Sequence, residues 1–186
     1  MATLVYPMEV SEDRSMAARF EELAMPLFDQ LYNFARWLTQ DRSEAEDLVQ
    51  ETFAKALRGF SSFQQGTNFR AWIYRILRNT FLTSRTGLKA TVSLDFDEGS
   101  EPPAGPDTPE SVLIDRSQRQ LVQQCLDELP VPFREILLLC EVEEMSYQEI
   151  AETIGIPIGT VMSRLSRARR ALRDRLSQKF AGTHHG

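Results

Sequence analysis

The sequence is poor in the residues that build metal sites and disulfide frameworks, with two cysteines and two histidines among 186 residues. Cys125 and Cys140 stand apart, without a CxxC pair or histidines at ligand spacing. His184 and His185 lie at the very end of the chain, where a metal site is not expected. We therefore expect no metal and no other cofactor, and a reducing cytoplasm fits best. The sequence does not decide whether either cysteine has a redox role.

Long hydrophobic runs are also missing, and the opening MATLVYPMEV lacks a basic segment followed by an apolar core. We therefore expect neither secretion nor membrane insertion. Apolar residues make up 42% of the chain and charged residues 26%, which is usual for a globular protein that folds.

The net charge of −6 conceals blocks of opposite sign. Residues 61–90 carry five basic side chains and no acidic one, and residues 164–186 carry seven basic side chains and one acidic one. Between them, residues 91–115 carry seven acidic side chains and no basic one. Two separate basic patches indicate two contacts with a polyanion.

The apolar periodicity is helical nearly everywhere, and no strand-like alternation persists. We predict an all-α fold of two small helical domains, residues 15–90 and 113–180. An acidic flexible linker, residues 91–112, rich in proline and glycine, joins them.

In the first domain, Ser43 and Glu46 have the spacing of a capping box, which predicts that a helix begins there. Asp47, Gln50 and Glu51 lie beside the apolar stripe of that helix. The spacing predicts a further helix over residues 69–84. Its expected outward residues are Tyr74, Arg75, Arg78 and Asn79.

In the second domain, the pattern predicts helices over residues 118–129 and 133–143. Ser146 and Glu149 form a second capping box, which opens a helix over residues 147–154. Gly155 suits the left-handed residue after that helix, and Pro157 suits the first turn of the next. Two helices joined by a tight turn, the second rich in arginine, are typical of a helix-turn-helix.

Helical geometry divides the last helix into a buried stripe and a DNA face. The stripe is Val161, Leu165, Ala168 and Leu172. The opposite side presents Ser163, Ser166, Arg167 and Arg170, with Met162 and Arg169 on one flank and Thr160 and Arg164 on the other. Arginines can bind guanine edges or phosphates, and small polar residues allow close approach to the bases. Because residues 164–186 contain a single aspartate, alternating charges within the helix do not explain the arginines, which favours DNA binding over a solvated face.

MSYQEIAETIGIPIGTVMSRLSRARRAL resembles the terminal DNA-binding domain of the extracytoplasmic-function (ECF) sigma factors, members of the sigma-70 family of bacterial RNA polymerase. EAEDLVQETFAKAL is similar to the polymerase-binding helix of the family. GTNFRAWIYRILRN is similar to its segment that melts and reads the minus-ten promoter element. The resemblance covers about residues 20–178, in the same order and with an acidic linker between the two parts.

The resemblance implies a sigma factor, not an enzyme, that directs promoter-specific initiation by binding core RNA polymerase, recognising the minus-thirty-five and minus-ten elements of promoter DNA and assisting strand opening. An anti-sigma factor is a further expected partner. Asp47, Gln50 and Glu51 match the positions that bind core polymerase. The segment SSFQQGTNF matches the loop that captures a base flipped from the non-template strand. The minus-ten residues are then Phe63, Gln65, Gly66, Thr67, Asn68 and Asn79. The minus-thirty-five residues are Thr160, Met162, Ser163, Arg164, Ser166, Arg167 and Arg170.

Two features depart from the family pattern. Asn79 is not followed by the usual aspartate and arginine cluster, and Met162 stands where lysine or arginine is common. Met162 would give an apolar contact, such as one with a thymine methyl group. The linker is similar to the segment that approaches the polymerase active site, although a plain tether remains an alternative.

Two other classes of protein stay open at this point. A stand-alone helix-turn-helix regulator would explain the second domain but would leave the DLVQE and GTNFRAW segments without a purpose. A helical metal-dependent hydrolase would need an HExxH motif or paired histidines and carboxylates, which the sequence lacks. The promoter sequence, the inducing signal and the identity of any anti-sigma factor cannot be deduced.

Overall fold

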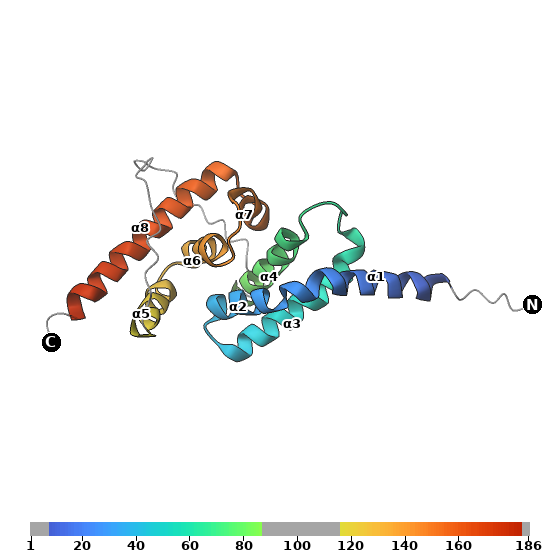
Figure 1. The fold of residues 1–186 in the computed structure, drawn as a ribbon, viewed down its shortest axis with the longest axis horizontal. Helices are drawn as coiled ribbons and strands as arrows, with labels where there is room; N and C mark the ends of the chain where they lie inside the picture. The colour runs from blue at the N-terminus through green and yellow to red at the C-terminus, as the bar shows by residue number, and fades with distance from the viewer. Residues whose placement is uncertain (1–7, 87–115, 184–186) are drawn as a thin grey trace, which may run out of the picture. The chain divides into compact units, whose positions relative to one another are not determined.

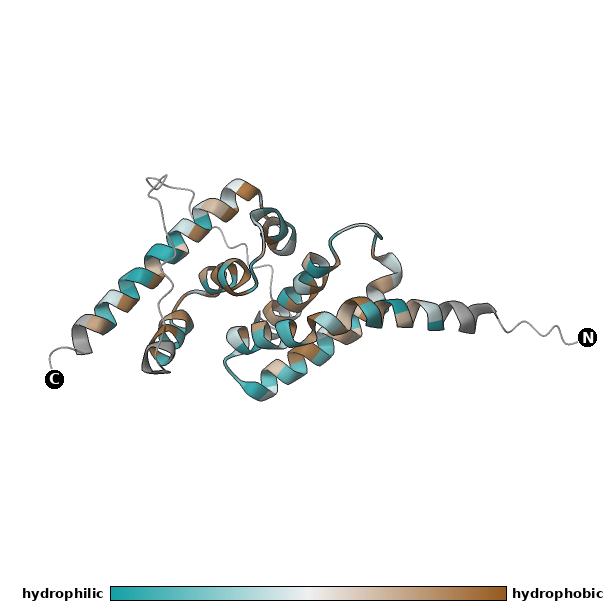
Figure 2. Cartoon of the chain, in the orientation of Figure 1, coloured by the Kyte–Doolittle hydropathy of each residue, from teal (hydrophilic) through white to brown (hydrophobic). Residues whose placement is uncertain are grey.

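The computed structural model describes residues 8–86 and 116–183, and the predicted linker over residues 91–112 lies outside these ranges. The chain divides into two compact units, residues 1–90 and residues 91–186. The described residues form helices and turns and no strand, so the predicted all-α fold is confirmed (Figure 1). Figure 2 shows hydrophobic and hydrophilic residues alternating along the helices, as helices half-buried in a core require.

The described part of the first unit, residues 8–86, contains four α-helices and two short 3₁₀ turns. The α-helices are α1 (Met8–Ala24), α2 (Phe28–Thr39), α3 (Arg42–Gly59) and α4 (Phe69–Thr86), and the 3₁₀ turns are η1 (Met25–Leu27) and η2 (Phe60–Ser62). Helices α2, α3 and α4 pack against one another. The largest fully buried side chains of this unit are Tyr74, Phe34, Leu31, Leu38, Ile73 and Leu77.

Tyr74 corrects the prediction that its side chain faces away from the core. Its side chain is completely buried, and its ring lies 5.3 Å from that of Phe34 in α2. Because α4 contacts both α2 and α3, it buries a wider face than the single apolar stripe read from the sequence.

The start of α3 also differs from the expected capping box. The N-cap residue is Asp41, whose carboxylate accepts a hydrogen bond from the backbone N–H of Glu44 at 2.8 Å. Ser43 therefore lies inside the first turn, and Glu46 instead forms an ion pair with Arg42 at 2.9 Å. Aspartate and serine cap helices about equally well, so the preceding extended backbone at Asp41 decides between them.

The second unit contains α5 (Arg116–Asp127), α6 (Val131–Leu137), a π-helical turn η4 (Leu138–Val142), α7 (Tyr147–Ile154) and α8 (Ile158–Thr183). The predicted helix over residues 133–143 thus begins earlier and changes to a π-turn. Helix α8 packs on α5, α6 and α7. Arg134 is 7% exposed and donates hydrogen bonds to the carbonyls of Leu126, Asp127 and Leu129, which satisfies the end of α5.

Candidate functional site

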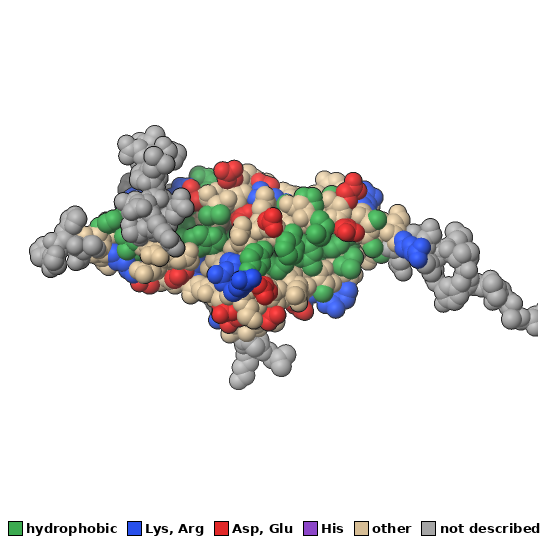
Figure 3. Space-filling view, turned by 60° about the horizontal axis from the view of Figure 1, so that its bottom comes forward, with side chains coloured by type: hydrophobic (Ala, Val, Ile, Leu, Met, Phe, Trp, Pro, Cys, Tyr) green, Lys and Arg blue, Asp and Glu red, His purple; other side chains and the backbone are tan. Residues whose placement is uncertain are grey.

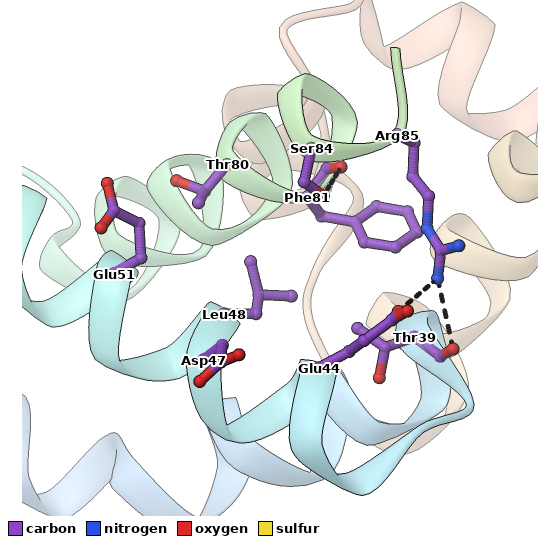
Figure 4. A pocket seen from close by; sticks show the side chains of 9 residues that line it. All are labelled: Thr39, Glu44, Asp47, Leu48, Glu51, Thr80, Phe81, Ser84 and Arg85. Carbon is purple, nitrogen blue, oxygen red and sulfur yellow. Dashed lines mark hydrogen bonds and ion pairs between the residues drawn. The ribbon is translucent and has the colours of Figure 1, made fainter. Parts of the chain in front are cut away.

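The exposed side of α3 carries the three residues assigned to polymerase binding. Asp47 and Glu51 lie one turn apart and line a pocket of about 360 Å³ between α3 and α4. Figure 4 shows α3 contributing Glu44, Leu48 and the two carboxylates, opposite Thr80, Phe81, Ser84 and Arg85 of α4. Glu51 also pairs with Lys55 at 3.3 Å. The pocket therefore has an apolar floor and an acidic α3 rim.

Arg85 closes one end of this pocket. Its Nη2 donates to Glu44 Oε2 at 2.8 Å and to the carbonyl of Thr39 at 3.3 Å (Figure 4). Its guanidinium also lies 5.3 Å from the centre of the Phe81 ring. The end of α4 is thereby joined to the corner between α2 and α3. Sequence reasoning did not identify this role, because the partners lie more than 40 residues away in the chain.

Gln50 does not share the pocket of Asp47 and Glu51. It lines a second hollow of about 590 Å³, together with Met25, Phe28, Tyr32 and Phe53. The large hydrophobic side chains exposed in the first unit are Leu23, Met25, Phe28 and Leu57. Figure 3 shows a face on which hydrophobic side chains gather over this unit. The structure thus places Gln50 at an apolar groove beside the acidic side of α3.

The sequence did not indicate that Met25 and Phe28 are exposed, because their spacing is that of the apolar stripe of a half-buried helix. Pro26 stands at the start of η1, where the chain leaves α1 and turns into α2. Met25 is 53% exposed and Phe28 is 40% exposed. A proline inside an apolar stretch is the signal that a continuous helix, and with it the buried stripe, is interrupted there.

The loop between α3 and α4 carries most of the assigned minus-ten residues. Phe63 is half-buried, and its ring lies 5.9 Å from Phe60, 5.3 Å from Phe69 and 5.0 Å from Trp72. This aromatic cluster (Phe60, Phe63, Phe69 and Trp72) anchors the start of the loop to α4. Trp72 packs within this cluster, and Phe63 packs with it.

Polar contacts fix the rest of the loop. The carbonyl of Gln64 accepts hydrogen bonds from the Thr67 hydroxyl at 2.6 Å and from the Thr67 N–H at 3.2 Å. Gly66 has a φ of +87° within this turn. The side-chain carbonyl of Asn68 accepts from the N–H of Ala71 at 3.0 Å, the usual bond of an N-cap residue.

Asn79 lies on the exposed surface of α4, ten residues after Phe69. At 1.5 Å per residue it is about 15 Å further along the helix axis. The structure therefore brings Phe63, Gln65, Gly66, Thr67 and Asn68 into one loop but leaves Asn79 apart from it.

The second unit contains the predicted helix-turn-helix. Ser146 and Glu149 form the reciprocal capping box at the start of α7, with the Ser146 N–H donating to Glu149 Oε2 at 2.9 Å. Gly155 has a φ of +79°, and its N–H donates to the carbonyl of Ala151 at 2.8 Å. Only three residues separate α7 from α8. The prediction of this motif is confirmed.

The faces of α8 agree with the prediction except at Leu172, which is only half-buried, and at Arg164. Val161, Leu165 and Ala168 are at most 1% exposed, and they face the core. Met162 is 55% exposed, Arg170 is exposed, and Thr160, Ser163, Ser166 and Arg167 are half-buried. Arg164 is only 8% exposed, which corrects its predicted place on the flank of the DNA face. It lies next to the buried stripe, where packing of α8 on the other helices covers it.

Several cations of α8 have acidic partners elsewhere in the second unit, which the count of charges within residues 164–186 did not show. Arg169 pairs with Glu141 of η4 at 2.6 Å. Lys179 and Arg175 both pair with Glu128, at 2.6 Å and 3.5 Å. The hydrogen bond from Lys179 lowers the pKa of the Glu128 carboxyl. The basic DNA face is therefore narrower than the sequence suggests and centres on Arg167 and Arg170.

The two cysteines lie in the second unit, Cys125 buried and Cys140 half-buried. Burial raises the pKa of both thiols. No group of three metal-binding side chains occurs in the described part of the chain. Within that same part, every helix is too short or too polar to span a bilayer.

Comparisons with known proteins identify both units. The model of sigma-70 region 2 matches residues 23–91, and the model of sigma-70 region 4 matches residues 119–172. The ECF RNA polymerase sigma factor SigE of Mycolicibacterium smegmatis is 36% identical over 177 residues, which cover 94% of this chain and 68% of that protein. The ECF sigma-E factor of Escherichia coli K12 is 33% identical over 141 residues, which cover 72% of this chain and 74% of that protein.

Solved structures agree with this assignment. The sigma factor RpoE of Bartonella quintana, solved with the anti-sigma factor NepR, has 30% identity and a TM-score of 0.63, covering 86% of this chain and 97% of that one. CnrH, solved with the cytosolic domain of CnrY, shares the fold at 24% identity and a TM-score of 0.64, covering 89% and 97%.

The chain belongs to the sigma-70 family and, within it, to the ECF sigma factors. It acts as an RNA polymerase sigma factor that directs promoter-specific initiation. The match of residues 23–91 to region 2 gives the first unit a purpose, which a stand-alone helix-turn-helix regulator would leave unexplained.

Proposed function

We propose that core RNA polymerase binds the exposed side of α3. Asp47 and Glu51 would be the charged contacts, and Gln50 would be a polar contact beside them. The observation that carries this proposal is the arrangement of an acidic rim next to an apolar groove on the same helix. Acidic side chains steer and orient a basic partner, and exposed aromatic side chains supply most of the binding energy. The polymerase surface that binds here would be a basic, partly apolar helix.

The loop between α3 and α4 is proposed to hold a base extruded from the minus-ten element, with Asn79 contacting DNA further along α4. Unpairing and unstacking a base costs a few kcal/mol, so an opened strand needs a preformed pocket that binds what it releases. The fixed turn at Gln64–Thr67 supports this role, because a rigid loop does not have to be ordered on binding.

In the second unit, α8 is proposed to enter the major groove of the minus-thirty-five element. Arg167 and Arg170 supply cationic contacts, and Thr160, Met162, Ser163 and Ser166 surround them at the start of the helix. Arg164 is only 8% exposed, so we assign it no direct contact with DNA. Its proposed role is to support α8.

Polymerase binding and DNA binding are proposed to depend on each other. A net charge of −6 limits the affinity of the free protein for duplex DNA. The basic side chains neutralise only a few phosphates, and the acidic side chains repel the DNA. Polymerase would hold both units so that the second DNA contact becomes intramolecular. The protein would have no chemistry of its own and would act in the cytoplasm, where the polymerase works. The Bartonella relative was solved in complex with an anti-sigma factor. An anti-sigma factor of this protein would compete with polymerase and DNA for these surfaces.

The test of this proposal is Asp47→Lys combined with Glu51→Lys. The double variant should lose association with core polymerase in a pull-down and should lose run-off transcription, while circular dichroism still reports a helical fold. The matched control is Glu21→Lys with Glu22→Lys, two exposed carboxylates of α1 that change the charge equally. Wild-type association by the α3 variant, or an equal loss in the control, would place the interface elsewhere.

A further inference from the structure

The loop between α3 and α4 contains side chains of two kinds, those engaged in holding the loop and those that point to solvent. Phe63 is engaged in the aromatic cluster, with three rings within 6 Å of its own. The Thr67 hydroxyl is engaged with the carbonyl of Gln64 at 2.6 Å. The Asn68 carbonyl is engaged with the start of α4 at 3.0 Å. These three residues build the loop.

The tip of the loop is formed by Gln65 and Gly66. The backbone bond from Thr67 N–H to the Gln64 carbonyl closes a four-residue turn, and Gln65 and Gly66 are its two central residues. The φ of +87° at Gly66 is that of the third residue of a type II turn, which glycine adopts without strain. A Cβ placed on Gly66 would meet no atom within 4 Å, so the space beside Gln65 is open.

The exposed amide of Gln65 matches the edge of a base chemically. A glutamine side chain presents one acceptor and two donors, which complement an amino group beside a ring nitrogen. Adenine and cytosine both carry that pair on the edge that is freed when a base leaves the duplex. Gln64 is also exposed, but it is the first residue of the turn, and its backbone carbonyl accepts the hydrogen bonds that close the turn. Its side chain therefore does not belong to the tip.

We propose that Gln65 is the residue that specifies the extruded base, an adenine or a cytosine, and that Asn68 is a positioning residue that caps α4. This inference rests on the proposed base capture by the loop. It separates residues that the family resemblance groups together, since it gives Asn68 no part in choosing the base.

The test uses full-length protein with core polymerase and a promoter set that carries each of the four bases at every non-template position of the minus-ten element. Gln65→Glu keeps the shape of the side chain but removes its donor. Asn68→Asp adds the same charge and keeps the capping acceptor. Gln65→Glu should change the preference between bases at one position by about tenfold, as for loss of a bidentate base contact. Asn68→Asp and Gln64→Glu should keep the wild-type order of bases.

Asn68→Ala separates capping from base contact. This variant should lower open-complex formation by the same factor for all four bases, and Asn68→Asp should restore it. Permanganate reactivity of unpaired thymines reports the opening. A changed order of bases with Asn68→Asp or Gln64→Glu, or an unchanged order with Gln65→Glu, overturns the assignment. If mutation of the loop tip leaves opening and base order untouched in every variant, including Gln65→Ala, the proposed base capture itself fails.

Discussion

The Nη2 atom of Arg85, near the end of α4, lies 2.8 Å from Oε2 of Glu44 in the first turn of α3. Both side chains are about half exposed. The same guanidinium group reaches the carbonyl of Thr39 at the end of α2. One side chain therefore joins three helices at the corner that borders the acidic pocket.

Arg85→Ala should lower the free energy of unfolding by about 1 kcal/mol, because exposed ion pairs contribute little and the carbonyl contact adds to them. Urea titration of Arg85→Ala, Glu44→Gln and the double variant gives the coupling energy directly. Strictly additive effects of the two substitutions would show that the pair contributes nothing.

Glu128 should make stability depend on pH in the acid range. Its pKa is lowered in the folded protein, chiefly by the hydrogen bond from Lys179, so its contribution is present above the unfolded pKa of about 4.3. It is lost as the pH falls through the folded value. The melting temperature of wild type should exceed that of Glu128→Gln at pH 6 to 7, and the difference should shrink below about pH 4. A difference that stays constant down to pH 2.5 would contradict the assignment.

Arg167→Ala should relax discrimination at one or two positions of the minus-thirty-five element, at a cost of about 1 to 3 kcal/mol for a lost base contact. The matched control is Arg175→Ala, since Arg175 lies in the same helix but pairs with Glu128. Selection of binding sites with polymerase holoenzyme measures both. The face is assigned wrongly if Arg167→Ala selects the wild-type sequence with the wild-type affinity.

Met162 should contact a thymine methyl group, since it is 55% exposed near the start of α8. Replacing each thymine of the minus-thirty-five element by deoxyuridine removes only that methyl group. At one position this should weaken wild-type binding about fourfold, the value of one buried methyl group. Met162→Ala should bind the two DNAs equally. An equal loss in both proteins would exclude the contact.

Local signals predicted the helix-turn-helix almost to the residue. The helix Tyr147–Ile154 begins at a capping box and ends at Gly155, and all of these signals lie within ten residues of one another. Where two local signals compete, the prediction fails, as when Asp41 caps α3 in place of Ser43.

The sites were harder to predict because their contacts join distant parts of the chain. The residue types gave no indication that Glu141 and Glu128 neutralise cations of α8, or that Arg164 is covered. Likewise, a helical wheel places Gln50 beside Asp47, yet the two residues line different hollows. Asp47 lines the one between α3 and α4, and Gln50 lines the one formed with Met25, Phe28 and Tyr32.

Helix α8 is a continuous rod of 26 residues, and near its far end Lys179 pairs with Glu128, the residue that follows α5. From Thr160 to Lys179 the axis extends about 28 Å. A rotation of one degree at the Glu128 contact would therefore displace the end that is proposed to face DNA by about 0.5 Å, if α8 pivots there as a rigid rod. The position of the proposed DNA face would then depend on a contact near the other end of the helix, so Glu128 would influence promoter choice from a distance.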